Sequence, residues 1–244
     1  MSARVRIGTS GWEYRDWKGR FYPADLPKDR WLEFYAEHFD CVELNASFYR
    51  LPSAEIFAGW RRRVPDGFAF AVKASRYLTH IRRLREPTEP LDRLWSRARS
   101  LEDRLGPVLY QLPPRWWPNP ERLASFLAAL PDSPQVLEFR DRAWYRPDIL
   151  AMVDAAGVAV CLHDMPGSSP PAGRLGPLVY VRFHGAGAKY AGRYSSQRLS
   201  AWAGRMAAWA SDGWPVWAFF NNDIGGQAVV DAARLRAMVE RRLG

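Results

Sequence analysis

Short apolar runs rich in Val, Leu and Phe recur along the chain, and most are separated by longer segments with helical spacing. This alternation is typical of βα units around a parallel sheet. Eight such runs occur, at residues 5–9, 41–47, 68–74, 107–112, 135–140, 158–164, 178–184 and 215–222. Eight strands in 244 residues predict an α/β fold, a TIM-type (β/α)₈ barrel that forms a single domain over residues 1–244, because an open doubly wound sheet usually carries fewer strands.

The segments between the runs have the spacing and the start signals of helices. Asn119-Pro120-Glu121, for example, places a capping side chain before a proline at the first helical position. Seven helices are predicted, at residues 29–38, 54–63, 91–105, 121–130, 147–156, 197–211 and 227–243. After the sixth run the pattern fails, because residues 166–177 form a Pro/Gly/Ser stretch that leaves no room for a full helix. We therefore expect the barrel helix after strand six to be reduced or missing.

Polar side chains interrupt the runs at alternate positions. In the second run, for example, Glu43 and Asn45 alternate with Val42 and Leu44. Strand side chains point in turn to the helix layer and to the barrel interior, so the apolar set belongs under the helices. The polar set then converges inside the barrel, toward the C-terminal strand ends where active sites of this fold are built. Its members are Glu43, Asn45, Lys73, Glu138, Arg140, His163, Tyr180, Arg182 and His184.

Two interpretations of these charges are open. They can form a buried ion-pair network without chemistry, because buried charged groups are almost always paired. They can also line a ligand-binding mouth, which we favour, because a lumen that only stabilises the barrel would be filled by Val, Ile and Leu. In such a mouth, proton transfer is assigned to His163, His184 or Lys73, and acid–base or metal duty also to Glu43 and Glu138.

The loops after the strands carry aromatic rings next to cations. Trp12 and Trp17 follow the first run and Trp144 follows the fifth, each near Arg or Lys. Rings beside cations suit stacked bases with nearby phosphates, although each ring can also simply anchor its loop. We take these three tryptophans as candidate stacking residues.

Glycine-rich turns follow the last two runs. Barrels of this class often bind phosphate there, because free N–H groups at a helix N-terminus favour an anion and glycine lets the backbone approach closely. We therefore expect a phosphate or ligand site at these turns and at the polar strand ends. Its candidate residues are Asn45, Arg140, Arg182, Gly185, Gly187, Lys189, Arg193, Asn221, Asn222 and Gly225.

The charge balance gives weak support for an anionic partner. The chain carries 35 Lys and Arg against 26 Asp and Glu, a formal charge of +9, but many of the arginines fall on expected helix surfaces. The two cysteines are too few for a disulfide framework. No signal-peptide or membrane-spanning apolar stretch occurs, so we expect a cytoplasmic protein without a membrane partner.

Metal ligands are few, and the sequence requires no cofactor. No H-E-x-x-H motif or histidine-rich cluster is present, and no G-x-S-x-G motif points to acyl chemistry. One divalent ion is compatible with the donors Glu43, Glu138, His80, His163 and His184, together with Asp164 or Asp223.

A set of specific segments runs from one end of the chain to the other. They are Gly8-Thr9-Ser10-Gly11-Trp12, Phe21-Tyr22-Pro23, Val42-Glu43-Leu44-Asn45, Phe48-Tyr49, Phe70-Ala71-Val72-Lys73, Thr79-His80, Gln111-Leu112-Pro113-Pro114, Glu138-Phe139-Arg140, Val181-Arg182-Phe183-His184-Gly185 and Phe219-Phe220-Asn221-Asn222-Asp223. With them the chain resembles the YecE-like family, a bacterial group of unknown function. The resemblance implies a TIM-type barrel and supplies no reaction. The barrel is also broadly similar to the endonuclease IV and xylose isomerase superfamily, although the histidine-rich zinc cluster of endonuclease IV-like enzymes is missing from this sequence.

Together these patterns favour a mouth that binds a phosphate-bearing ligand, DNA or RNA or a nucleotide, with phosphodiester hydrolysis as a candidate reaction. One alternative is an isomerase or lyase acting on a small phosphorylated sugar, with Lys73 or a histidine as proton carrier. The other alternative is a binding module without catalysis. A polynucleotide would bind less tightly as salt rises, because each phosphate contact releases counterions.

Overall fold

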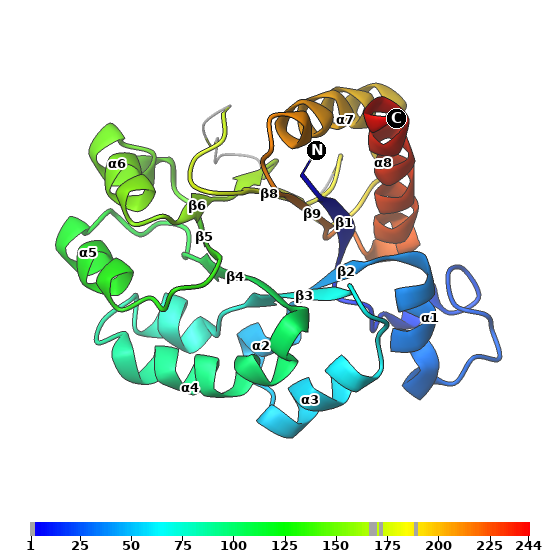
Figure 1. Ribbon diagram of the computed structural model, residues 1–244, viewed down its shortest axis with the longest axis horizontal. Helices are drawn as coiled ribbons and strands as arrows, with labels where there is room; N and C mark the ends of the chain where they lie inside the picture. The colour runs from blue at the N-terminus through cyan, green and yellow to red at the C-terminus, as the bar shows by residue number, and fades with distance from the viewer. Residues whose placement is uncertain (1–2, 166–169, 171–172, 188–189) are drawn as a thin grey trace.

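The computed structural model describes residues 3–165, 170, 173–187 and 190–244. Parallel strands form a ring that Figure 1 shows end-on, with the helices around its outside. In order along the sheet, the strands are β6 (Ala159–Val160), β5 (Gln135–Glu138), β4 (Leu105–Gln111), β3 (Ala69–Lys73), β2 (Cys41–Leu44), β1 (Val5–Ser10), β9 (Val216–Phe220), β8 (Val179–Phe183) and β7 (Leu162–His163).

The ring closes through the sixth predicted strand, which is interrupted at Cys161. Its first half, β6, pairs with β5, and its second half, β7, pairs with β8. The nine segments therefore correspond to the eight predicted runs, and the TIM-type barrel is confirmed. Because all the strands are parallel, their C-terminal ends lie at one end of the barrel.

Helices follow most of the strands. Those in the described residues are α1 (Trp31–His38), α2 (Ala46–Tyr49), α3 (Ala54–Arg62), α4 (Thr88–Ala98), α5 (Pro120–Ala128), α6 (Pro147–Ala155), α7 (Ser196–Ser211) and α8 (Gln227–Leu243). All but α2, a single turn, were predicted. α5 begins as expected, because the Asn119 side chain accepts a hydrogen bond from the Arg122 N–H at 2.9 Å. Between β7 and β8 the described residues contain no helix, as expected; residues 166–169 and 171–172 lie outside them.

The apolar residues form two layers. Val42, Leu44 and Val72 belong to the larger cluster, which lies between the strands and the helices. The smaller cluster lies inside the ring, because its members come from strands around the whole circle and contact one another. These members are Cys41, Ala71, Leu109, Val136, Ala159, Cys161, Leu178, Tyr180 and Phe219. The predicted alternation is therefore confirmed, and the polar strand residues continue the inner set toward the C-terminal ends.

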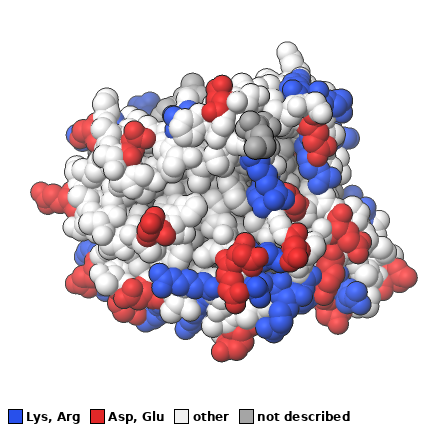
Figure 2. All heavy atoms as spheres, viewed as in Figure 1, with Lys and Arg blue, Asp and Glu red and all other residues white. Residues whose placement is uncertain are grey.

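Charges of both signs are mixed on the surface. Figure 2 shows acidic and basic side chains side by side along the lower and right parts of one face, with a broad uncharged area left of centre. The net charge of +9 is therefore not gathered into one basic field on this face. None of the helices in the described part of the chain has the length and apolar character needed to cross a membrane.

A close approach of β1 to β2 makes the barrel sensitive to one glycine. A Cβ added at Gly8 would lie 2.3 Å from the main-chain oxygen of Cys41, so Gly8→Ala must separate two paired strands. We expect it to lower the free energy of unfolding by roughly 2–4 kcal/mol in urea denaturation. As the control, Gly204→Ala on the exposed side of α7, where a Cβ meets nothing within 4 Å, should raise stability by up to about 1 kcal/mol. Equal stability of the two variants would contradict this account.

Candidate functional site

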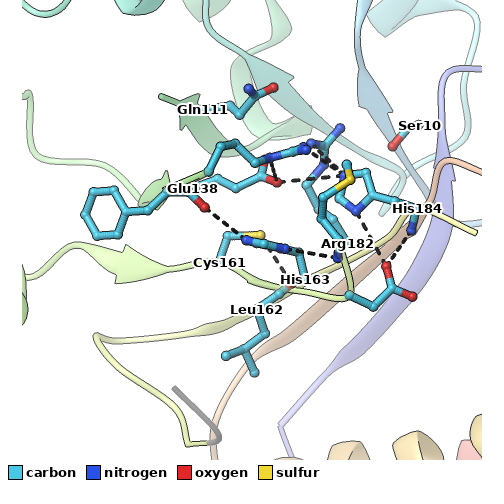
Figure 3. A network of polar contacts seen from close by, with 12 residues as sticks. Ser10, Gln111, Glu138, Cys161, Leu162, His163, Arg182 and His184 are labelled. Carbon is cyan, nitrogen blue, oxygen red and sulfur yellow. Dashed lines mark hydrogen bonds and ion pairs between the residues drawn. The ribbon is translucent and has the colours of Figure 1, made fainter. Parts of the chain in front are cut away.

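Arg182 on β8 is the centre of a buried ion-pair network inside the barrel. Its side chain is fully buried, and its Nη2 lies 2.8 Å from Glu43 Oε1 on β2. Its Nη1 lies 2.7 Å from Glu138 Oε2 on β5. One guanidinium thus joins carboxylates from two separate parts of the ring. Figure 3 shows this network, with Glu138, Arg182 and His184 close together inside the strands.

Both carboxylates in this network are held in the charged form. Burial alone would raise the pKa of Glu43, but the Arg182 charge and a 2.7 Å hydrogen bond from the Ser10 hydroxyl outweigh it, so the pKa is lowered. The Tyr180 hydroxyl also donates to Glu43, at 2.7 Å. Burial likewise opposes ionisation of Glu138, and the Arg140 and Arg182 charges hold its pKa well below the usual value.

The expected acid–base role of Glu43 and Glu138 therefore does not fit the structure. Both side chains are fully buried and their charges are balanced by arginine, so neither can exchange a proton with a ligand near neutral pH. Both oxygens of Glu138 are bound by arginine, and the two oxygens of Glu43 are bound by Arg182 and Tyr180. Within the described residues, no group of three or more His, Cys, Asp or Glu side chains could hold a metal ion.

Arg140 joins this network to His184. Its Nε lies 2.6 Å from Glu138 Oε1, and its Nη2 donates to His184 Nε2 at 2.9 Å. Arginine can only donate, so Nε2 accepts and the His184 proton is on Nδ1, which lies 3.6 Å from Asp164 Oδ1. Burial lowers the pKa of His184 to about 4, with the Arg182 charge adding to the effect and Asp164 opposing it. His184 is therefore neutral at physiological pH.

His163 is held by the backbone rather than exposed to a ligand. Its Nε2 lies 3.0 Å from the Phe139 carbonyl oxygen, and its Nδ1 accepts from the Met165 N–H at 3.2 Å. Burial lowers its pKa, which favours the neutral ring. Both ring nitrogens therefore have backbone partners, and proton transfer by His163 stays a prediction.

Lys73, at the end of β3, differs from the rest of the network. Its Nζ lies 4.1 Å from the centre of the Phe48 ring, and in the described part of the chain no ion pair or hydrogen bond of Nζ is found. The Ser47 hydroxyl donates to the Lys73 main-chain oxygen at 2.7 Å and so links α2 to the end of β3. Burial, and then the Arg182 charge, lower the pKa of Lys73 to about 7. An exposed fraction of 8% keeps the residue within reach of solvent.

Smaller polar groups surround Lys73 at the barrel mouth. The His80 ring meets the far side of Phe48 edge-on at 5.0 Å, and burial together with the Lys73 charge lowers the pKa of His80 to about 4. Gln111 and Asn221 keep small exposed areas at the ends of β4 and β9. We define the barrel mouth as Lys73, His80, Gln111, Arg140 and Asn221, above the floor formed by Glu43, Glu138 and Arg182.

The predicted phosphate loops are largely used by the protein itself. The Gly225 N–H donates to Asp16 Oδ2 at 3.0 Å, and the Gly185 N–H donates to the Tyr194 hydroxyl at 2.8 Å. Asn222 is fully buried and donates to Asp231 Oδ2 at 3.0 Å. These three residues therefore offer no free donor to an anion, contrary to expectation. Gly187 and Arg193 are exposed, and Lys189 lies outside the described residues.

The tryptophans expected to stack on bases are buried. Trp17 and Trp144 have no exposed surface. Their indole N–H groups donate to the Asp223 and Trp116 main-chain oxygens and so anchor the loops. Trp12 is 6% exposed and packs edge-on against Trp60, with ring centres 5.3 Å apart. Trp17 and Trp144 therefore offer no surface on which a base can stack, and Trp12 offers very little.

Two residues near the mouth were missed from the sequence. Tyr180 was placed inside by its strand parity but given no role, and it proves to donate to Glu43. Asp223 was considered only as a metal donor; burial, reinforced by the neighbouring Asp16 charge, raises its pKa to about 7. Asp16 lies more than 200 residues earlier in the chain, so no local pattern around Asp223 signals this shift.

A closed parallel barrel with a charged network at the C-terminal strand ends places this chain among the TIM-type barrels. The model of the DUF72 family, which is described as a protein of unknown function, matches residues 6–243. The chain therefore belongs to the DUF72 family. The chain is similar to UPF0759 protein YunF of Bacillus subtilis, with 28% identity over 97% of this chain and 95% of that one. It is 36% identical to UPF0759 protein YecE of Escherichia coli over 52% of this chain and 44% of that one.

Solved structures agree with this assignment. A DUF72 family protein from Thermotoga maritima superposes with a TM-score of 0.87 at 28% identity, over 97% of this chain and 99% of that one. A DUF72 family protein from Enterococcus faecalis gives a TM-score of 0.83 at 20% identity, over 97% and 96% of the two chains, which shows the shared fold.

Because the pKa of Lys73 is lower in the native state than in the unfolded chain, its charged amine destabilises the native protein at low pH. Lys73→Met should therefore raise the free energy of unfolding at about pH 6 by on the order of 3 kcal/mol, because the native state then no longer buries a charged amine. Below pH 7 the amine is protonated in both states, so the native protein bears the full penalty. Between the native pKa of about 7 and the unfolded value of 10.5, only the unfolded chain stays protonated, and the gain shrinks as pH rises.

Urea denaturation of Lys73→Met across this pH range measures the effect. Lys28→Met is the matched control, because the Lys28 ammonium is exposed and pairs with Glu13 at 2.9 Å. A gain for Lys73→Met that stays constant from neutral to alkaline pH would show that the amine has an ordinary pKa.

Proposed function

We propose that the barrel mouth binds a compact phosphate-bearing small molecule, with Arg140 and Lys73 as the cations that face it. The supporting observation is the charge balance of the lumen. When Lys73 is protonated, Arg140, Arg182 and Lys73 supply three positive charges against the two carboxylates of Glu43 and Glu138, while the buried histidines are neutral. One positive charge is left without a counterion among these groups, and a bound anion would supply it.

Several features favour a compact ligand over a polynucleotide. The mouth residues Lys73, Gln111 and Asn221 are each less than a tenth exposed, so a ligand group must enter the barrel to reach them. The buried rings of Trp17 and Trp144 provide no stacking surface for bases. At the C-terminal ends of β1 and β2, Trp12, Asn45 and Trp60 line a cavity of about 250 Å³, which has room for a small organic group.

Lys73 makes this site suited to proton transfer. An amine with a pKa of about 7 is half neutral at physiological pH, so it can take a proton from a ligand and return it. Reactions of this kind include the isomerase and lyase chemistry of phosphorylated sugars. A bound phosphate would raise the pKa of Lys73 again, because an opposite charge favours the ammonium. Ligand binding and proton uptake are therefore coupled in this site.

Thermal unfolding with hexose phosphate and with sulfate tests the proposal. At about 100 times the dissociation constant, either anion should raise the melting temperature by roughly 5 °C. Arg140→Gln should abolish the shift, because it removes the cation whose contacts lie in the mouth. Arg241→Gln removes the same charge from the exposed end of α8 and should leave the shift unchanged.

The pH and salt dependence of these shifts separate the candidate ligands. Sulfate does not titrate near neutral pH, so its shift should weaken above about pH 7 as Lys73 loses its proton. A short oligodeoxynucleotide should bind weakly or not at all. Tight, steeply salt-dependent oligonucleotide binding that survives Arg140→Gln would overturn the small-molecule proposal and support a nucleic-acid interface elsewhere.

A further inference from the structure

We propose that Lys73 is the nucleophile of this site, and that its amine forms an imine with the carbonyl carbon of a small phosphorylated aldehyde or ketone. This inference rests on the proposed function, because the phosphate must bind in the mouth to bring the carbonyl carbon to Nζ. It adds a covalent step and a narrower substrate class: a phosphate ester that also carries a free carbonyl group.

The surroundings of Lys73 leave its amine available for attack. Within the described residues, Nζ takes part in no hydrogen bond or ion pair, whereas the guanidiniums of Arg140 and Arg182 are each held by a carboxylate. The carboxylates that would otherwise neutralise Lys73 are thus occupied by arginine. The Nζ atom lies 4.1 Å from the centre of the Phe48 ring, and Lys73 keeps an exposed fraction of 8% at the end of β3.

The charge environment keeps this amine reactive. Only the neutral form of an amine is nucleophilic, and an ordinary lysine with a pKa of 10.5 is neutral in about one molecule in three thousand at pH 7. With a pKa of about 7, half of the Lys73 side chains are neutral at the same pH. Arg182 contributes to this effect, because a fixed cation nearby disfavours the ammonium. Its own charge cannot be lost, since arginine stays protonated.

The chemical step balances without a metal or a redox partner. The Nζ lone pair forms a bond to the carbonyl carbon, and the C=O bond breaks. The carbonyl oxygen leaves as water with the two protons that the amine loses, and the resulting C=N bond takes up one proton to become an iminium ion. The iminium then draws electrons from the neighbouring carbon, which is how an imine serves isomerase and lyase reactions.

Reductive trapping tests the proposal on the intact chain. The protein is incubated at pH 7 with dihydroxyacetone phosphate and cyanoborohydride, which reduces an imine to a stable secondary amine, and its peptides are examined by mass spectrometry. Only four lysines can carry the adduct: Lys18, Lys28, Lys73 and Lys189. We expect at least a tenfold excess of adduct on Lys73 over the exposed Lys28. The trapping rate at Lys73 should rise with pH to a plateau with a midpoint near 7.

Three variants and one inert ligand provide the controls. Lys73→Arg cannot form the imine, so its adduct should disappear, while glycerol 3-phosphate, which has no carbonyl group, should still raise the melting temperature of the parent protein. Lys28→Arg should trap as the parent does. Arg140→Gln should reduce trapping of dihydroxyacetone phosphate much more than trapping of dihydroxyacetone.

The outcomes distinguish the two proposals. Adduct spread evenly over the exposed lysines, or absent from Lys73, while glycerol 3-phosphate still stabilises the protein would overturn the imine and leave the phosphate site standing. If glycerol 3-phosphate gives no shift and Arg140→Gln does not change trapping, the phosphate site itself is wrong. Selective trapping at Lys73 that depends on Arg140 supports both.

Discussion

The barrel mouth depends on the ion pairs that the buried guanidinium of Arg182 forms with two carboxylates. This guanidinium joins Glu43 from β2 and Glu138 from β5 across the lumen, at 2.8 and 2.7 Å. Removing one member of such a group leaves an uncompensated charge in a dry interior, which typically costs about 3–5 kcal/mol. The network therefore links β2, β5 and β8 across the lumen, next to the apolar cluster that fills the ring.

Charge in the floor also determines the chemistry above it. Each carboxylate is bound by arginine, and Ser10 and Tyr180 add hydrogen bonds to Glu43. These contacts make the carboxylates poor proton carriers and poor metal ligands, although paired carboxylates suggest both roles when only the sequence is considered. Lys73 lies near fixed cations, and within the described residues its amine forms no ion pair with a carboxylate, so its charged form is disfavoured. Burial and then the Arg182 charge lower the pKa of Lys73, and the floor carboxylates oppose this shift only in part.

Strand residues could be predicted from the sequence, and loop residues largely could not. Alternation along β2 and β8 placed Glu43 and Arg182 inside the barrel, because the side-chain period of a strand does not depend on distant contacts. The prediction that Gly225 binds phosphate did not account for a distant contact. The Gly225 N–H donates to Asp16, which lies 209 residues away in the sequence. Trp144 was taken as a candidate stacking residue, but it has no exposed surface, and its indole N–H donates to the Trp116 main-chain oxygen. Such partners depend on how the loops fold over one another, and no local pattern encodes them.

The contrast between Lys73 and Arg140 explains why the reactive group lies on β3. Both side chains are cationic and nearly buried at the same end of the barrel, but an arginine stays charged at any physiological pH and can only bind an anion. A lysine loses its proton when burial and neighbouring cations disfavour the ammonium, and both conditions hold at Lys73. Exchanging the two residues would place the titratable amine beside Glu138, where the carboxylate would hold its proton. The pairing of Arg140 with Glu138 is thus what leaves a neutral amine available at the end of β3.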